Sequence, residues 1–217
     1  MKVVNGVILS LVLASCSTSE EVNDEVTLDE NGNLIKKEYF EDGSLKAEIT
    51  VNEEGVIDGE VRQYYPNGAL INRVTFKNGV RSGNNLVYHD NGNLQLEESY
   101  DQEGMLDGKF LEYFEDGQLK YKGQYGAGVK VGLWETYRED GSLEEINEYN
   151  RDQFNGLQKV YHKNGQLGVI GEAVNDHEVK NWIYLDLDGD TLKVEDYSME
   201  GVLINTKVFK KVSNKGE

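Results

Sequence analysis

The chain has 217 residues, of which 22 are Lys or Arg and 40 are Asp or Glu, so its formal net charge is −18 at pH 7. This charge excludes nucleic acid and anionic bilayers as the main partner, because both would repel the chain. One cysteine excludes a disulfide framework and a zinc site with four thiolates, whereas 13 Tyr and 6 Phe are too many for a disordered acidic tail.

Residues 1–15 are predicted to be a targeting signal rather than part of the fold. Lys2 precedes a mostly apolar run from Val3 to Leu13. As a helix this run would be about 16 Å long, which is too short to span a bilayer core of about 30 Å. The segment Leu13-Ala14-Ser15-Cys16 follows, and it resembles the bacterial lipobox. The resemblance implies that the signal is removed and that Cys16 becomes a lipidated N-terminus; the alternative is an ordinary secretory signal with an incidental cysteine.

Residues 16–30 are predicted to be an acidic, flexible tether, because they are rich in Ser, Thr, Asn and acidic residues and hold few apolar ones. The Glu20-Glu21 pair is similar to the acidic export signals of surface lipoproteins in Bacteroidetes. Together with the lipobox, this similarity implies a lipoprotein of the bacterial cell envelope, at the outer membrane. Its only contact with the membrane would be the lipid on Cys16.

Residues 31–210 are predicted to consist of one unit repeated about seven times, and residues 211–217 form a short C-terminal tail. An Asp/Asn-Gly dipeptide recurs every 24 or 25 residues, usually with Leu two positions after the glycine. These structural turn glycines are Gly43, Gly68, Gly92, Gly117, Gly141, Gly165 and Gly189. A fixed period of this length is the signature of a repeat architecture.

Each unit is predicted to be a β-hairpin, because Asp/Asn-Gly between apolar runs is the strongest short-range hairpin signal. A three-residue loop with its glycine in the left-handed conformation places Tyr113 directly opposite Leu119. This register also predicts that Tyr113, Leu119 and Tyr125 share one face of the sheet. Trp134 and Tyr137 are three residues apart and would face opposite sides of a regular strand. The whole body is predicted to be all-β, an elongated single-sheet antiparallel meander.

Two further positions recur in each unit. A second glycine, such as Gly108 or Gly132, lies nine residues before the turn glycine, and Lys180 takes its place in the last unit. Aromatic residues follow this position at two and at five residues. They form the candidate interaction surface, which comprises Tyr64, Tyr88, Tyr113, Trp134, Tyr137, Tyr161 and Trp182. These side chains either pack across the strands or stay open as docking anchors, and the sequence supports both interpretations.

The segment Gly132-Leu133-Trp134-Glu135-Thr136-Tyr137-Arg138-Glu139-Asp140-Gly141 resembles the MORN repeat. The spacing of 24 residues and the turn are similar to the bacterial variant found in YwqK-family antitoxin-like proteins and in many lipoproteins, over residues 34–205. Trp134 and Trp182 match the tryptophan of the family, whereas Asn85 and Gln158 stand at the same position in their own units. The resemblance implies a hairpin array that contacts proteins or lipids and carries no chemistry.

No group of residues predicts catalysis, a metal site or a cofactor. His89 and His162 lie three repeats apart, about 30 Å in such a sheet, and are predicted to be turn residues. The segment from Asp186 to Asp190 resembles a calcium loop, but the position of its glycine does not fit.

We therefore expect a non-enzymatic, lipid-anchored envelope protein whose repeats present an interaction surface to a protein or a glycan. The alternative is a YwqK-like antitoxin or immunity protein that neutralises a toxin by binding it. The acidic charge of the chain would suit a basic toxin.

Overall fold

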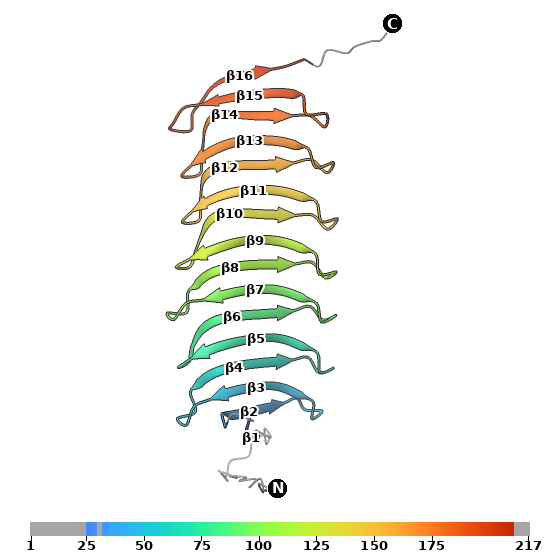
Figure 1. The fold of residues 1–217 in the computed structure, drawn as a ribbon, viewed down its shortest axis with the longest axis vertical. Helices are drawn as coiled ribbons and strands as arrows, with labels where there is room; N and C mark the ends of the chain where they lie inside the picture. Colours follow the sequence, from blue (N-terminus) through green and yellow to red (C-terminus); the bar gives the residue numbers. More distant parts are fainter. Residues whose placement is uncertain (1–24, 30–31, 211–217) are drawn as a thin grey trace, which may run out of the picture.

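The structure, a computed structural model, describes residues 25–29 and 32–210, and these residues form one antiparallel sheet of sixteen strands (Figure 1). Each strand pairs with its neighbours in the sequence, so the order in the sheet is β1 to β16 without a crossover. The strands are β1 (Glu25–Leu28), β2 (Leu34–Tyr39), β3 (Leu45–Val51), β4 (Ile57–Tyr64), β5 (Leu70–Lys77), β6 (Val80–Tyr88), β7 (Leu94–Tyr100), β8 (Leu106–Tyr113), β9 (Leu119–Gly126), β10 (Val129–Tyr137), β11 (Leu143–Asn150), β12 (Gln153–Tyr161), β13 (Leu167–Val174), β14 (His177–Leu185), β15 (Thr191–Tyr197) and β16 (Leu203–Val208). The predicted all-β meander is confirmed.

The sheet begins earlier than predicted. Residues 25–28, which are assigned above to the flexible tether, form β1 and pair with β2 from Glu25↔Lys37 to Leu28↔Leu34. The carboxylate of Asp29 stabilises the turn between these strands, because it accepts hydrogen bonds from the backbone N–H and the side-chain amide of Asn33, both at 2.8 Å. The signal 1–15, the lipid-attachment residue Cys16, the tether up to residue 24 and the tail 211–217 lie outside the described residues.

The seven Asp/Asn-Gly turns have the predicted three-residue loop. In the β8–β9 turn, the N–H of Gly117 donates to the carbonyl of Phe114 at 2.9 Å, and the N–H of Phe114 donates to the carbonyl of Gln118 at 2.8 Å. Gly117 has a φ of 86°, which is strained for any residue with a side chain. The carboxylate of Asp116 accepts from the N–H of Gln118 at 2.9 Å, which explains the Asp or Asn before each glycine.

Next to each of these turns the second strand contains a β-bulge that the sequence did not predict. Tyr113 is opposite Leu119, as expected, but its neighbour Glu112 is opposite Tyr121. Lys120 is therefore an extra residue, and the alternation of side chains is reversed beyond it.

The bulge assigns the aromatic residues to two different faces. Tyr125 lies on the face opposite Tyr113, where its ring contacts Phe110 at 5.5 Å between centroids. The prediction that Tyr113, Leu119 and Tyr125 share one face is therefore wrong. We call the side that carries Phe110, Trp134 and Trp182 the tryptophan face. The tyrosine face carries Tyr64, Tyr88, Tyr113, Tyr137 and Tyr161.

The second recurring glycine forms a wider bulge in the first strand. Gly132 has a φ of 66°, and Lys180, in the same position of the last unit, has a φ of 58°. In β10 the residues from Gly132 to Trp134 stand opposite Gly123 alone, between the pairs Val131↔Gln124 and Glu135↔Lys122. This bulge brings the indole ring of Trp134 over Gly123.

Most of the buried side chains of this single-layer sheet form one row across the middle of the tryptophan face, and Ala47, Ala173 and Val179 are buried outside it. The central row comprises Val61, Val74, Asn85, Glu98, Phe110, Gly123, Trp134, Asn147, Gln158, Gly171 and Trp182. Trp134 is only 1% exposed, and the four polar members are 6–8% exposed. The Asn85 amide donates to the Glu98 carboxylate at 2.8 Å, so these buried polar groups satisfy each other across the strands.

Candidate functional site

The structure divides the predicted interaction surface between the two faces of the sheet. The five tyrosines of the set lie on the tyrosine face, and Trp134 and Trp182 lie on the tryptophan face. The reason is the spacing of three residues between the two aromatic positions of each first strand, because side chains alternate along a strand. One flat partner surface could therefore contact only part of the set.

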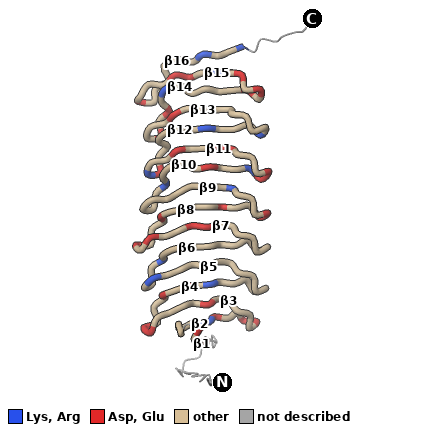
Figure 2. Tube along the Cα trace, in the orientation of Figure 1, with Lys and Arg blue, Asp and Glu red and all other residues tan. Residues whose placement is uncertain are grey.

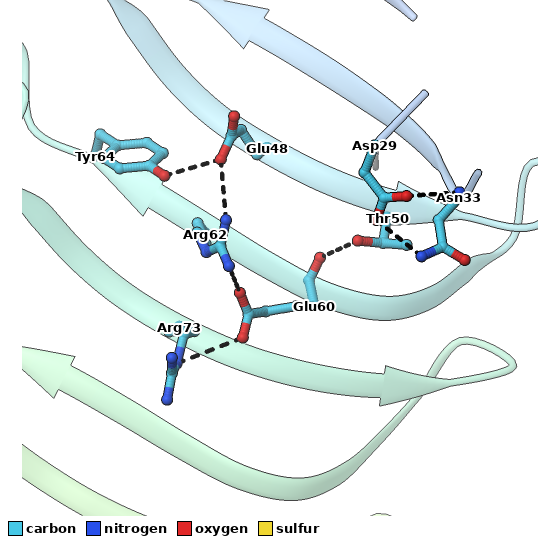
Figure 3. A network of polar contacts seen from close by, with 8 residues as sticks. All are labelled: Asp29, Asn33, Glu48, Thr50, Glu60, Arg62, Tyr64 and Arg73. Atoms are coloured by element: carbon cyan, nitrogen blue, oxygen red, sulfur yellow. Dashed lines mark hydrogen bonds and ion pairs between the residues drawn. The ribbon is translucent and has the colours of Figure 1, made fainter. Parts of the chain in front are cut away.

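On the tyrosine face, the hydroxyls of Tyr64 and Tyr137 donate to neighbouring carboxylates. The O–H of Tyr64 donates to Glu48 at 2.9 Å, and the guanidinium of Arg62 lies 3.5 Å from the same carboxylate (Figure 3). Arg62 also pairs with Glu60, which Arg73 approaches at 3.4 Å. Burial, followed by the hydrogen bond that Tyr64 donates to Glu48, raises the pKa of Tyr64. These charges are paired within the sheet, and they border a polar hollow of about 480 Å³.

On the tryptophan face, Trp134 is the centre of an aromatic cluster. Its ring centroid lies 5.1 Å from that of Tyr125, 5.3 Å from Tyr121, 5.5 Å from Phe110 and 6.1 Å from Tyr149. Because these rings and Lys130 leave the indole 1% exposed, Trp134 is a packing residue. Of the two interpretations of the aromatic positions, the packing one applies to this residue.

The cluster holds the ammonium group of Lys130 against its aromatic faces. The Nζ atom lies 4.4 Å from the ring centroid of Trp134, 5.2 Å from Tyr149 and 5.3 Å from Tyr121. Cation–π contacts of this kind are worth about 0.5–2 kcal/mol each, depending on exposure. Lys130 therefore closes the cluster against solvent and supplies a positive charge to it.

The two tryptophans differ in how their indole N–H groups are satisfied. The N–H of Trp182 donates to the carbonyl of Glu172 at 3.0 Å, whereas the N–H of Trp134 is buried and has no partner among the described residues. A buried donor without an acceptor costs about 1–3 kcal/mol. The packing of the Trp134 ring has to offset this cost.

A hollow of about 600 Å³ opens on the tryptophan face beside the cluster. Its apolar lining is aromatic, and its charged lining carries both signs. The side chains on this face are those of Phe110, Phe114, Tyr121, Tyr125, Trp134 and Thr136, with Lys120, Lys130, Arg138, Glu112, Glu139 and Glu144. The hollow thus combines an aromatic floor with a rim of mixed charge.

The histidines connect successive turns. The Nε2 atom of His89 lies 3.1 Å from the carbonyl oxygen of Tyr113 in the next unit, and that of His162 lies 3.0 Å from the carbonyl of Leu185. Their prediction as turn residues is confirmed. In residues 25–29 and 32–210, His, Cys, Asp and Glu side chains form no group of three or more that could hold a metal ion.

The segment from Asp186 to Asp190 closes as a turn like its counterparts in the other repeats. The carboxylate of Asp186 accepts from the N–H of Asp188 at 2.9 Å and from that of Asp190 at 3.0 Å.

In the part of the chain that the structure describes, no helix is long and apolar enough to cross a bilayer.

Sequence reasoning missed Lys130 and the glycines that lie beneath the tryptophans. A Cβ atom on Gly123 would lie 2.1 Å from the Trp134 ring, and one on Gly171 would lie 2.2 Å from Trp182. The available signal was a glycine in the middle of a strand, which often marks a close approach of another group. Both glycines stand four residues after the leucine of their unit, in the two units whose following strand carries tryptophan.

The free energy of unfolding is expected to decrease at alkaline pH, because the cluster contains a tyrosine that resists ionisation. Burial, followed by the charges of Tyr121 and Glu145, raises the pKa of Tyr149 to about 12. The unfolded chain would ionise this tyrosine near pH 10. Stability is therefore fully present below pH 10 and is lost as the pH rises toward 12. Denaturation at several pH values between 10 and 12 measures this loss of stability. The loss should be smaller in Tyr149→Phe than in the natural chain, and an equal loss in both would contradict the assignment to Tyr149.

A comparison with models of protein families finds the MORN repeat variant in six stretches of the chain. They are residues 33–53, 57–78, 81–102, 106–126, 130–151 and 154–171. Together they cover more than half of the sequence and follow successive hairpins from β2 onward. No curated protein matches the chain.

Proposed function

The chain belongs to the MORN repeat variant family, and from this premise we propose that it is a non-enzymatic, lipid-anchored envelope protein whose sheet binds a partner protein. Proteins of this family are generally non-enzymatic, and their repeats are interaction modules. The observation that carries the proposal is the hollow on the tryptophan face, because its lining is largely aromatic, whereas the hollow on the tyrosine face is lined mostly by polar residues.

The composition of the hollow favours a protein as the partner. Aromatic rings offer contact area at a small cost in conformational entropy, and arginine is enriched at the centres of protein interfaces. Arg138 reaches into the next unit, where its guanidinium donates to the carbonyl of Tyr161 at 2.6 Å, so its position is fixed before binding. A preorganised charge of this kind reduces the ordering cost of association.

Lipid on Cys16 would attach this surface to a membrane. From Cys16 to Glu25 the chain can extend about 30 Å at most. The net charge of −18 would keep the sheet itself away from anionic lipid. The lipid would then provide the membrane contact, and the faces of the sheet would stay free for the partner.

The interaction surface can be tested with two lysines that lie two residues apart on opposite faces. Lys120 lines the hollow and bonds Glu112 at 2.6 Å, whereas Lys122 bonds Glu135 at 3.1 Å on the tyrosine face. The measurement is the amount of partner that the full chain captures from an envelope extract. We expect Lys120→Glu to reduce this amount at least tenfold and Lys122→Glu to leave it unchanged. Equal capture by both variants would exclude the hollow, and capture of a glycan would change the class of partner.

The anchor is tested separately. Cys16→Ala is expected to prevent lipid attachment, so that labelled fatty acid is not incorporated and the protein leaves the membrane fraction. Cys16→Ala that still fractionates with membranes would contradict the lipoprotein assignment. Neither result depends on which face of the sheet binds.

An antitoxin or immunity role is the second candidate, and the net charge favours it. A chain at −18 would be attracted to a basic toxin or nuclease at long range, which raises the rate of association. Repeating the capture with a cytosolic extract distinguishes the two candidates, because a basic toxin would be recovered from the cytosol and would not require Cys16.

A further inference from the structure

Exposed apolar side chains gather at the two ends of the sheet. Of the fifteen large hydrophobic residues that are exposed in the described part of the chain, eight lie between residues 187 and 209. On β16, Ile204 is 68% exposed and Val208 is 71% exposed; on β1, Val26 is 57% exposed and Leu28 is 66% exposed. An exposed edge strand is a place where another strand can add; β1 has four residues and β16 has six.

Both edge strands direct backbone groups away from the sheet. The N–H of Asp29 donates to the carbonyl of Asn33 at 3.0 Å, so along β1 the odd-numbered residues bond β2. The N–H of Phe209 donates to the carbonyl of Leu192 at 2.9 Å, so next to it in β16 the odd-numbered residues bond β15. The backbone N–H and C=O groups of Val26 and Thr206 therefore point outward.

The charges of the two edges are complementary. β16 and the two residues after it contain Lys207 and Lys210 and no acidic residue, and Figure 2 shows blue without red on this strand. β1 and the residue after it contain Glu25 and Asp29 and no basic residue. Two β16 edges, or two β1 edges, would bring like charges together, which disfavours a symmetric pair. A β16 edge facing a β1 edge brings opposite charges together.

The topology permits this contact to continue the sheet. The number of strands is even, so a β1 placed beside β16 runs antiparallel to it, as every other neighbour in the sheet does. When Lys207 is opposite Glu25, Thr206 is opposite Val26, and both outward-pointing residues meet as a hydrogen-bonded pair. Glu25 pairs with Lys37, and Lys207 pairs with Val194, so both project from the tyrosine face and each face of one copy continues that of the next.

We propose that β16 of one chain pairs with β1 of a second copy, with Lys207 opposite Glu25, and that the copies join head to tail into a longer sheet. The contact is heterologous and does not close, so it generates an open filament rather than a dimer. The partner is this same chain, and the proposal is independent of what binds the hollow.

Cysteine cross-linking in the full chain tests the register directly, in a Cys16→Ser background that leaves only the engineered thiols. Glu25 and Lys207 would form a non-hydrogen-bonded pair with Cα atoms about 4.5 Å apart, which a disulfide can bridge. We expect a chain carrying both Glu25→Cys and Lys207→Cys to form a ladder of covalent oligomers on a non-reducing gel. Each single variant should run as a monomer on the same gel, because it has only one thiol at the contact. A covalent dimer of either single variant would indicate a symmetric pair and overturn the proposal, and so would the absence of any ladder.

Sedimentation measurements on the chain without engineered thiols provide a second test. Thr206→Pro removes an outward donor and keeps the bonds to β15, so it should abolish association without a loss of strand content, whereas Thr206→Val should associate normally. Lys207→Glu should weaken association roughly tenfold, and adding Glu25→Lys should restore it. A natural chain that is monomeric at every concentration, or a charge swap that fails to restore association, would overturn the proposal.

Discussion

Replacing Trp134 with alanine is expected to lower the free energy of unfolding by about 3–5 kcal/mol. The indole is 1% exposed and contacts four other aromatic rings, so its removal leaves a cavity in the only core that this part of the single-layer sheet has. Urea denaturation measures the effect. Leu133→Ala is the matched control, because this neighbouring side chain is 55% exposed and its loss should change stability by less than about 0.5 kcal/mol.

The loss should also be local. Each hairpin contacts mainly its sequence neighbours, so the stability of such an array is a sum of unit and interface contributions. Hydrogen exchange in Trp134→Ala should accelerate in β8 to β12 and change little in β2 to β5. If the free energy fell by less than about 1 kcal/mol, the ring would not be a core residue and the docking interpretation would regain support.

The turns could be predicted because they depend on local chemistry. Gly117 needs a positive φ and Asp116 needs a short acceptor, and both requirements can be read from the residues themselves. The opposition of Tyr113 and Leu119 followed from the loop length. Seven copies of one such pattern were enough to establish the all-β repeat fold.

The faces of the sheet could not be predicted, because they depend on bulges that have no distinctive residue. The extra residue Lys120 has no feature that separates it from an ordinary strand lysine, yet it reverses every side chain beyond it. The cluster around Trp134 was missed for the same reason, since Tyr121 and Tyr149 join it only after the registers are known. β1 was assigned to the tether because four residues of alternating pattern are too few to stand out from polar neighbours.

The buried row also shows how one repeat accommodates different sequences. In the hairpin of β4 and β5 the row contains Val61 opposite Val74, and both side chains are less than 8% exposed. On the next strand, β6, Asn85 is opposite Val74. At the corresponding boundary between β9 and β10, Gly123 takes the place of Val74 and Trp134 takes the place of Asn85. A large residue on one strand is thus matched by the absence of a side chain on the preceding strand, which leaves room for the ring.

This complementarity leads to a prediction for Gly123→Val, which is expected to destabilise the protein by about 3 kcal/mol or more. The new Cβ atom would lie 2.1 Å from Cδ2 of Trp134, with no room for the ring in its present position. The backbone of Gly123 has no positive φ, so the cost would come from this collision and not from strain in the main chain. Gln124→Val adds the same side chain at an exposed neighbouring position and serves as the control.

The double variant Gly123→Val with Trp134→Val distinguishes this explanation from a general intolerance of the position. It replaces the indole by a side chain small enough to leave room for the new valine, so we expect it to be more stable than Gly123→Val alone. The coupling energy in a double-mutant cycle should reach about 1–3 kcal/mol, because the second substitution removes the collision that the first creates. Effects that added to within about 0.5 kcal/mol would mean that the two residues do not interact. In that case the glycine would be required for the bulge at Gly132, and the tryptophan would be held by Lys130 and its aromatic neighbours alone.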